Sequence, residues 1–151
     1  MPKLSEIILN NGIILNVQNT EKIAVIKELA QKLIEQNLIS DTEEFFSAIL
    51  RRENLESTGI GQGVAIPHAR TSAIKNIVIV FGRSQTGVDF SSLDGQPSHL
   101  IFLIAAPENM KTEYIMTLAR LSRLLRKSEV RQALMAAQTS NDVIEIIRQY
   151  E

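Results

Sequence analysis

Two uninterrupted apolar runs constrain the fold of this chain more than any other feature. Residues 77–81 and 99–106 are almost entirely aliphatic or aromatic, and Pro107 ends the second run. A strand without alternating polar residues has both faces covered, which is typical of the central strands of a sheet between layers of helices. Amphipathic segments separate these runs from other short apolar stretches. The sequence therefore predicts an α/β fold, with a mixed β-sheet flanked by helices on both faces.

The helices are predicted from apolar residues that recur at helical spacing. They are expected at residues 21–36, 40–52, 112–127, 129–138 and 141–149, after a helical turn within residues 3–11. The residues expected to cap them are Thr20, Ser40, Ser128 and Ser140. In the helix at 112–127, the residues expected to face the core are Ile115, Leu118, Ala119, Leu121, Leu124 and Leu125. Other strands are predicted at residues 13–17 and 64–66, with Gly82 and Gly87 flanking a turn after the run at 77–81.

The composition is that of an ordinary globular protein, and it argues against several classes of function. The 151 residues fit one domain, residues 1–151, and 16 basic against 17 acidic residues leave a net charge of −1. This balance gives no bulk attraction for nucleic acid or for an anionic membrane. The absence of cysteine excludes disulfides and thiolate chemistry. Without a signal pattern or an apolar stretch of ~18 residues, we expect a cytoplasmic protein without membrane insertion.

Chemistry is expected in residues 57–70, which contain three of the seven glycines, one of the four prolines and one of the two histidines. The alternating glycines are Gly59, Gly61 and Gly63. They let the backbone take positive φ or allow another group to approach its N–H donors. Pro67 has no backbone donor and is expected at the end of the strand at 64–66. The sequence therefore predicts that His68 stands at a strand tip beside a glycine-rich loop.

A histidine in that setting suits the chemistry of an anion. Exposed N–H groups and a neighbouring arginine can hold phosphate oxygens while the imidazole acts as nucleophile, acid or base. The alternative is a tight hairpin that happens to end in His68. The stretch does not match the dinucleotide-binding or P-loop patterns. A metal site or a histidine-dependent hydrolase is disfavoured, because His99, about thirty residues away, gives no ligand spacing and is expected to be an edge or hydrogen-bonded residue.

The segment from Thr58 to His68 reads TGIGQGVAIPH. It resembles the active-site signature of the fructose/mannitol-type enzyme IIA domains of the bacterial phosphoenolpyruvate-dependent sugar phosphotransferase system, a family that includes nitrogen-regulatory IIA proteins. Segments at residues 52–53, 90–97, 103–108 and 118–125 resemble family segments in the same order. The resemblance covers essentially the whole chain and implies the mannitol-type IIA fold. It also implies that His68 accepts a phosphoryl group from a histidine-containing phosphocarrier protein, with no metal or organic cofactor.

The resemblance implies roles for the residues around His68 as well. Arg52 lies at the end of a predicted helix, where a cation also suits the helix dipole, and the family pattern implies that its guanidinium stabilises the phosphoryl group. Glu53 either orients Arg52 or is solvated, and solvation is favoured. The hydroxyl of Thr58 either donates to the phosphate or stabilises the turn. Support for the phosphate is also expected from the loop glycines, Gly59, Gly61 and Gly63.

One position departs from the family pattern and leaves the output open. Tyr114 falls where sugar-transport members have a second histidine near the first. A tyrosine hydroxyl donates a hydrogen bond but carries no positive charge at neutral pH, so it stabilises an incoming dianion less well. Either Tyr114 supports a slower transfer to a IIB domain, or the phosphorylation state regulates a target protein, which is favoured. The alternative is a non-catalytic regulatory module that binds its target on the same fold.

Overall fold

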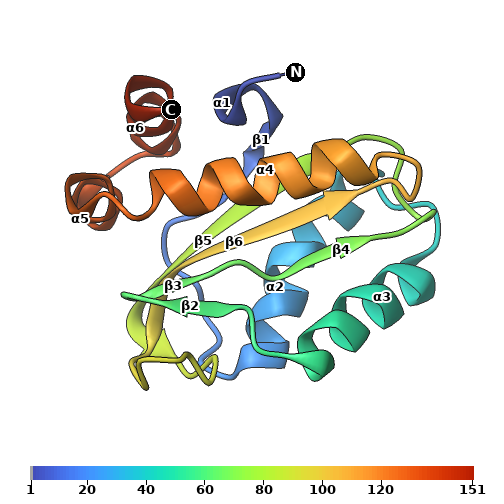
Figure 1. Ribbon diagram of the computed structural model, residues 1–151, viewed down its shortest axis with the longest axis horizontal. Helices are drawn as coiled ribbons and strands as arrows, with labels where there is room; N and C mark the ends of the chain where they lie inside the picture. The colour runs from blue at the N-terminus through green and yellow to red at the C-terminus, as the bar shows by residue number, and fades with distance from the viewer. Residues whose placement is uncertain (1) are drawn as a thin grey trace.

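A computed structural model describes residues 2–151 and contains one six-stranded sheet between two layers of helices (Figure 1). The strands are β1 (Ile8–Ile14), β2 (Gly59–Gly61), β3 (Val64–Ala65), β4 (His68–Arg70), β5 (Val78–Val88) and β6 (Ser98–Ala106). The helices are α1 (Leu4–Ile7), α2 (Lys22–Glu35), α3 (Thr42–Leu55), α4 (Lys111–Leu124), α5 (Ser128–Ala136) and α6 (Ser140–Tyr150). The predicted α/β fold with a mixed sheet is confirmed.

The sheet is built around β5 and β6, which contain the two apolar runs. Its order is β1-β5-β6-β3-β2, and β4 also pairs with β6. Strands β5 and β6 are antiparallel, whereas β1 is parallel to β5 and both β3 and β4 are parallel to β6. Because β3 and β4 follow one another along the same side of β6, the chain between them stays at the edge of the sheet.

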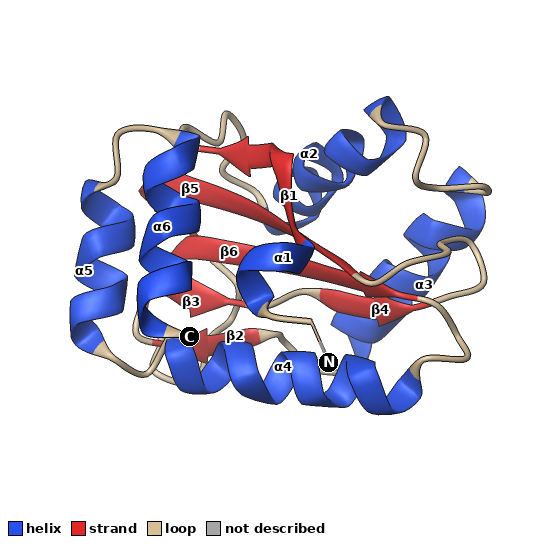
Figure 2. Ribbon diagram, turned by 90° about the horizontal axis from the view of Figure 1, so that it is seen from above, coloured by secondary structure: helices blue, strands red, loops and turns tan. Residues whose placement is uncertain are grey.

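The side chains of β6 alternate between two buried clusters, one on each face of the sheet. One cluster takes Leu100, Phe102 and Ile104, and the other takes Ile101, Leu103 and Ala105. Helices α1, α4, α5 and α6 cover the first face, and α2 and α3 cover the second (Figures 1 and 2). The expectation that this run is covered on both faces is therefore confirmed. Among residues 2–151, no helix has the length and apolar character needed to cross a membrane.

Two strand boundaries differ from the prediction. Strand β1 begins at Ile8, inside the segment predicted as a helical turn, because α1 is only four residues long. Strand β5 extends from Val78 to Val88 and continues past Gly82, although its pairing with β6 shifts register between Arg83 and Val88. A Cβ at Gly82 would lie 2.7 Å from a methyl of Leu29 in α2. Glycine at this position therefore allows a helix to pack closely on the sheet, which a sequence pattern does not distinguish from a turn.

The residues that cap the helices differ from those predicted. The structure places Glu21, Asp41 and Thr139 at the N-caps of α2, α3 and α6, where each side chain accepts a backbone N–H. Ser40 does not cap α3, because its hydroxyl and its backbone N–H both donate to the carbonyl of Ala73. Ser128 lies inside α5 after Lys127. Each prediction is wrong by one residue, within the usual error of sequence-based boundaries.

Helix α4 and the residue after it place Leu118, Leu121, Leu124 and Leu125 against the core as expected, but not every residue predicted to face it. Thr117, Leu121 and Leu124 are its buried residues. Ile115 is 53% exposed, and Ala119 is exposed as well. Ile115 lies two residues from Thr117, which is about 200° around the helix axis. The prediction that Ile115 and Ala119 face the core is therefore wrong, and α4 leaves an apolar side chain on the surface beside Tyr114.

Candidate functional site

Pro67 separates two short strands that share one partner. Val64 and Ala65 pair with Leu100 and Ile101 of β6, and His68 pairs with Ile104 further along the same strand. Between them the carbonyl of Pro67 accepts the N–H of Ile104 at 3.0 Å. His68 is therefore the first residue of β4. The prediction that it stands at the tip of the preceding strand is wrong. Backbone pairing holds it on both sides.

The imidazole of His68 is anchored through one nitrogen. His68 is 7% exposed, and its Nδ1 lies 2.6 Å from the carbonyl oxygen of Ile66. Since a carbonyl only accepts, Nδ1 carries the proton and Nε2 keeps its lone pair. The buried side-chain N and O atoms without a partner among residues 2–151 are Ser92 Oγ, Ser98 Oγ and Thr117 Oγ1. Nε2 is not among these atoms and has no hydrogen bond in that part of the chain, so it keeps access to solvent.

The surroundings of His68 favour the neutral imidazole. Burial lowers the pKa of His68, and the guanidinium of Arg52 lowers it further. The carbonyl of Ile66 and the carboxylate of Glu53 oppose this shift. A neutral ring with Nδ1 protonated presents Nε2 as a nucleophile near pH 7.

A tyrosine lies beside this histidine and shares a cavity with several arginines. The ring of Tyr114 lies 5.7 Å from the imidazole, measured between centroids. Arg52, Arg70 and Tyr114 line a shallow cavity of about 260 Å³ at the sheet edge, where β4 lies between α3 and α4 (Figure 1). Burial raises the pKa of Tyr114 to about 12, and both guanidinium groups oppose that shift. Tyr114 therefore stays protonated and can donate a hydrogen bond.

The guanidinium groups of Arg52 and Arg70 are each held by a backbone carbonyl, whereas Arg51, which also lines the cavity, donates to the hydroxyl of Ser47. Nη1 of Arg52 donates to the carbonyl of Glu56 at 2.8 Å, and Nη1 of Arg70 donates to the carbonyl of Glu108 at 2.6 Å. A guanidinium has five N–H donors, so each retains donors for an anion. The cavity thus combines arginines with a neutral donor, groups that bind phosphate, although Glu44 and Glu108 also line it.

Arg70 was not predicted as a site residue, although the sequence carries a signal for it. His68 and Arg70 are two residues apart on β4, so their side chains leave the strand on the same face. An arginine at this spacing from a candidate nucleophile is close enough to serve the same anion. The spacing becomes informative only when β4 is recognised as a strand that follows Pro67.

Thr58 and Glu53 meet in a buried contact that the prediction missed. Glu53 is 3% exposed, so the expectation that it is solvated is wrong. Its carboxylate accepts the N–H of Thr58 at 3.0 Å and the hydroxyl of Thr58 at 2.6 Å. The ammonium of Lys22 lies 3.4 Å from the same carboxylate. The hydroxyl of Thr58 is therefore directed to Glu53, which supports the second role considered for it, that of fixing the turn.

The glycine turn lies away from His68. Gly61 and Gly63 have φ of +93° and +80°, and they turn the chain from β2 into β3. The carbonyl of Gly63 accepts the N–H groups of His99 and Leu100. Since His68 pairs with Ile104, four residues further along β6, the turn is about 13 Å away. The loop predicted beside His68 thus lies toward the other end of β6.

Gly59 is closer to the site but does not face it. Its N–H donates to the hydroxyl of Ser57 at 3.0 Å. A Cβ on Gly59 would lie 2.2 Å from Oγ of Ser92 and 3.0 Å from Cβ of Phe90. Glycine at this position allows the hairpin to pack on the segment after β5. The N–H groups of the three glycines are therefore not directed toward His68, where phosphate support was expected from them.

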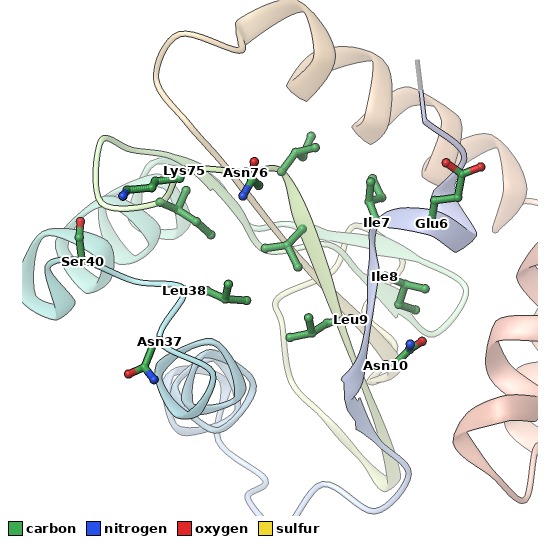
Figure 3. Close-up of a pocket in the computed structure, with 13 residues that line it drawn as sticks. Glu6, Ile7, Ile8, Leu9, Asn10, Asn37, Leu38, Ser40, Lys75 and Asn76 are labelled. Atoms are coloured by element: carbon green, nitrogen blue, oxygen red, sulfur yellow. The ribbon is translucent and has the colours of Figure 1, made fainter.

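A larger cavity lies in another part of the molecule. It has a volume of about 510 Å³ and lies between β1, the segment that follows α2, and the start of β5. Figure 3 shows the aliphatic side chains of Leu9 and Leu38 on its walls, with Asn76 at its rim. The residues that line it include no histidine, arginine or tyrosine. Within residues 2–151, no three His, Cys, Asp or Glu side chains are grouped in a way that could hold a metal ion.

Comparison with known families identifies the family of the chain. A family model described as the phosphoenolpyruvate-dependent sugar phosphotransferase system, EIIA 2, matches residues 6–150. The chain belongs to this family. The resemblance noted in the sequence is therefore confirmed.

The relatives that match this chain include both sugar-specific components and nitrogen regulatory proteins. The fructose-specific EIIABC component of Bacillus subtilis is 44% identical over 149 residues, which are 99% of this chain and 24% of that relative. The chain thus spans about a quarter of that protein. The nitrogen regulatory protein of Bradyrhizobium diazoefficiens is 32% identical over 145 residues, 95% of this chain and 94% of the relative.

Solved structures agree with the fold. The crystal structure of the nitrogen regulatory protein IIA-Ntr from Neisseria meningitidis matches with a TM-score of 0.88 and 32% identity, covering 95% of this chain and 97% of that one. The mannitol enzyme IIA of Escherichia coli, in a complex with phosphorylated enzyme IIB, matches with a TM-score of 0.79 and 22% identity, covering 92% and 95%. The second likeness is one of fold alone.

Proposed function

We propose that His68 is the phosphoryl acceptor of this enzyme IIA domain and that its donor is the phosphohistidine of a histidine-containing phosphocarrier protein. The observation that carries the proposal is the state of the imidazole. Nδ1 is held by the carbonyl of Ile66, and Nε2 makes no hydrogen bond in the described part of the chain. The ring lies 5.7 Å from that of Tyr114, which lines a cavity with Arg52 and Arg70. Family membership supports the reaction class, and the site geometry supports the choice of residue.

The proposed reaction is an in-line displacement at phosphorus. The lone pair of Nε2 forms a new N–P bond as the N–P bond of the donor breaks. The donor ring, protonated on its other nitrogen, leaves with that electron pair as a neutral imidazole, and the His68 ring becomes cationic until Nδ1 releases its proton to solvent. The PO₃ group passes between the two rings with its negative charge spread over three oxygens. Such transfers depend mainly on positioning and on stabilisation of that charge. The step as written needs no metal ion and no organic cofactor.

The residues around Nε2 have separate roles in this proposal. Arg52 and Arg70 each offer N–H donors to the equatorial oxygens, and their backbone contacts keep them in place before the donor arrives. Tyr114 donates a neutral hydrogen bond, which its raised pKa of about 12 keeps available at physiological pH. Glu53 and Thr58 support the hairpin without contacting the phosphoryl group.

Regulation by the phosphorylation state is the output we propose first. Tyr114 supports it, because a neutral donor stabilises a dianion less than the second histidine that sugar-transport members of the family have. Transfer to a IIB domain is the second candidate. It is supported by the 44% identity to a fructose-specific component and by the fold shared with a mannitol enzyme IIA that was solved in a complex with enzyme IIB.

Incubation with phosphoenolpyruvate and the two general phosphotransferase proteins tests the proposal. We expect one acid-labile phosphate per chain, located on His68 by peptide mapping at alkaline pH. A protein that binds a target but takes up no phosphate would instead be a non-catalytic regulatory module. Adding a IIB domain to the phosphorylated protein then separates the two outputs, since only a transport component passes the label on rapidly.

A further inference from the structure

A continuous line of hydrogen bonds connects a buried carboxylate to the imidazole of His68. The carboxylate of Glu53 accepts both the N–H and the hydroxyl of Thr58. The carbonyl of Thr58 accepts the N–H of Ile66 at 3.0 Å. The carbonyl of Ile66 then accepts Nδ1–H of His68 at 2.6 Å. Four residues from α3, the hairpin and β4 are thereby joined in one path.

The burial of Glu53 indicates that this path is specifically built. Its side chain is 1% exposed, and both oxygens act as acceptors toward Thr58. Lys22, which lies 3.4 Å away and is 24% exposed, is the cation paired with it in the described part of the chain. Burial of a carboxylate is costly unless its oxygens are satisfied. Here the contacts that satisfy it fix the residue at the start of the hairpin.

The other end of the path is equally constrained. The carbonyl of Ile66 precedes Pro67, whose ring fixes φ and whose nitrogen donates no hydrogen bond. The position of that carbonyl is set by the Ile66 N–H on one side and by the pairing of Pro67 with Ile104 on the other. Its lone pair selects the Nδ1–H form of the ring. A shift of Thr58 would move this acceptor and release the imidazole.

We propose that Glu53 is a positioning residue, which holds His68 in the Nδ1–H tautomer through Thr58 and Ile66 and so directs Nε2 toward the incoming phosphoryl group. The value of this arrangement for transfer rests on the proposed function. Its effect on the ring does not, because the tautomer is a property of the unphosphorylated protein.

The tautomer is therefore the first readout. We expect ¹⁵N–¹H NMR of the wild-type imidazole to show a single Nδ1–H form of His68 at pH 8. Glu53→Gln should give a mixture of the two tautomers, because an amide presents only one acceptor to the two donors of Thr58. Glu56→Gln is the matched control. It removes the same charge from an exposed residue three positions away and should leave the single form unchanged.

Phosphorylation kinetics give the second readout. With a pre-phosphorylated carrier protein, we expect Glu53→Gln to lower kcat about tenfold or more while KM for the carrier changes less than about twofold. Thr58→Ser keeps both contacts to Glu53 and should behave as the wild type. Thr58→Val keeps only the N–H contact and should lie between the two, which preserves the test if Glu53→Gln does not fold.

Two results would overturn the inference. One is a Glu53→Gln or Thr58→Val protein that is folded and retains the wild-type tautomer. The other is a Glu56→Gln protein with the same loss of kcat as Glu53→Gln, which would indicate a general effect of charge. If wild-type protein takes up no phosphate but the tautomers respond as described, the proposed function fails and the positioning role stands.

Discussion

The two histidines of this protein are held in the same way but lie in different surroundings. Nδ1 of His68 lies 2.6 Å from the carbonyl of Ile66, and Nδ1 of His99 lies 2.8 Å from the carbonyl of Ser84. Both rings therefore have a fixed tautomer with Nε2 left over. Anchoring through Nδ1 is thus not what distinguishes a reactive histidine in this fold.

The cations around each ring make the difference. The ring of His68 lies 5.7 Å from Tyr114, which lines a cavity with Arg52 and Arg70. Each of these two guanidinium groups makes one described contact to a carbonyl and keeps other donors. His99 lines a cavity of about 420 Å³ that also contains Arg131. Arg131 donates to the carbonyls of Leu125 and Arg126, close to the end of α4. Arg52 and Arg70 therefore keep donors that an anion could accept, whereas Arg131 is used to join α4 and α5.

Removing each imidazole is the most severe test of this comparison. We expect His68→Ala to abolish phosphorylation, because no other nucleophile lies in that cavity in the proposed mechanism. His99→Ala should keep the wild-type rate within about twofold, since only a backbone contact is lost. Incorporation of labelled phosphate from phosphoenolpyruvate measures both. Residual labelling of His68→Ala at the wild-type level would place the acceptor elsewhere.

Neutralising the cations should have the next largest effect. Arg52→Gln is expected to lower the rate constant of transfer about a hundredfold, as is typical when a fixed donor to a developing charge is lost. Arg70→Gln should lower it about tenfold, because this side chain is more exposed and its contribution is weakened by solvent. Arg148→Gln, an exposed arginine on α6, is the control for net charge. Equal rates for all three variants would refute the role of the cavity.

Removing the tyrosine hydroxyl should cost less. Tyr114→Phe deletes one neutral hydrogen bond and is expected to lower the rate three- to tenfold, or about 1 kcal/mol. Tyr114→His introduces a side chain that can carry positive charge and should raise the rate at pH 6 to 7. Single-turnover transfer from a labelled carrier protein measures both changes. A rate that is unaffected by Tyr114→Phe would remove Tyr114 from the site.

The pH dependence should be mild above neutral pH and steep below it. The neutral imidazole is the nucleophile, and burial and Arg52 lower the pKa of His68 from 6.5. At pH 6.5 more than half of the rings are therefore still neutral, so the rate should lose less than half of its value between pH 8 and pH 6.5. It should then fall through the lowered pKa. A pH titration of the His68 ring by NMR that gives a midpoint above 6.5 would contradict this assignment.

The glycine turn gives the smallest expected effect on function. Gly63 has φ of +80°, and a Cβ there would meet nothing closer than 3.9 Å. Gly63→Ala should lower the free energy of unfolding by about 1 kcal/mol through backbone strain alone, measured by urea denaturation. Phosphorylation should be unchanged, because the turn belongs to the His99 end of β6. A large loss of phosphoryl transfer in a folded Gly63→Ala protein would restore the glycine loop as a phosphate site.

The sequence predicts the parts of this molecule that depend on local pattern. The long helices and the two central strands follow from spacing and from apolar runs, and a specific motif singles out His68 as the proposed acceptor. The position of the glycine turn relative to His68 does not follow from that motif. Gly63 and His68 are close in the sequence but far apart in the structure. They are separated because β3 and β4 both run along β6 and carry the chain away from the turn.

The supporting residues depend on contacts between distant segments. Glu53 is predicted as solvated because a glutamate in the last turn of a helix usually faces water, yet the hairpin at residues 57–66 folds back over it. Arg70 becomes recognisable only once His68 is known to begin a strand. Gly82 looks like a turn residue until α2 is placed against the sheet. In each case the missing information is which segment packs on which.

The pairing of Pro67 with β6 bears on how a partner distinguishes the two states of this protein. The backbone before and after Pro67 is hydrogen-bonded to the same long strand, β6. The backbone that carries the imidazole of His68 is therefore fixed in position. Under the proposed function, adding PO₃ there deposits roughly two negative charges at an unmoving spot. Phosphorylation then changes the local electrostatic potential. A partner protein recognises this change through its own charged residues, without a rearrangement of a loop.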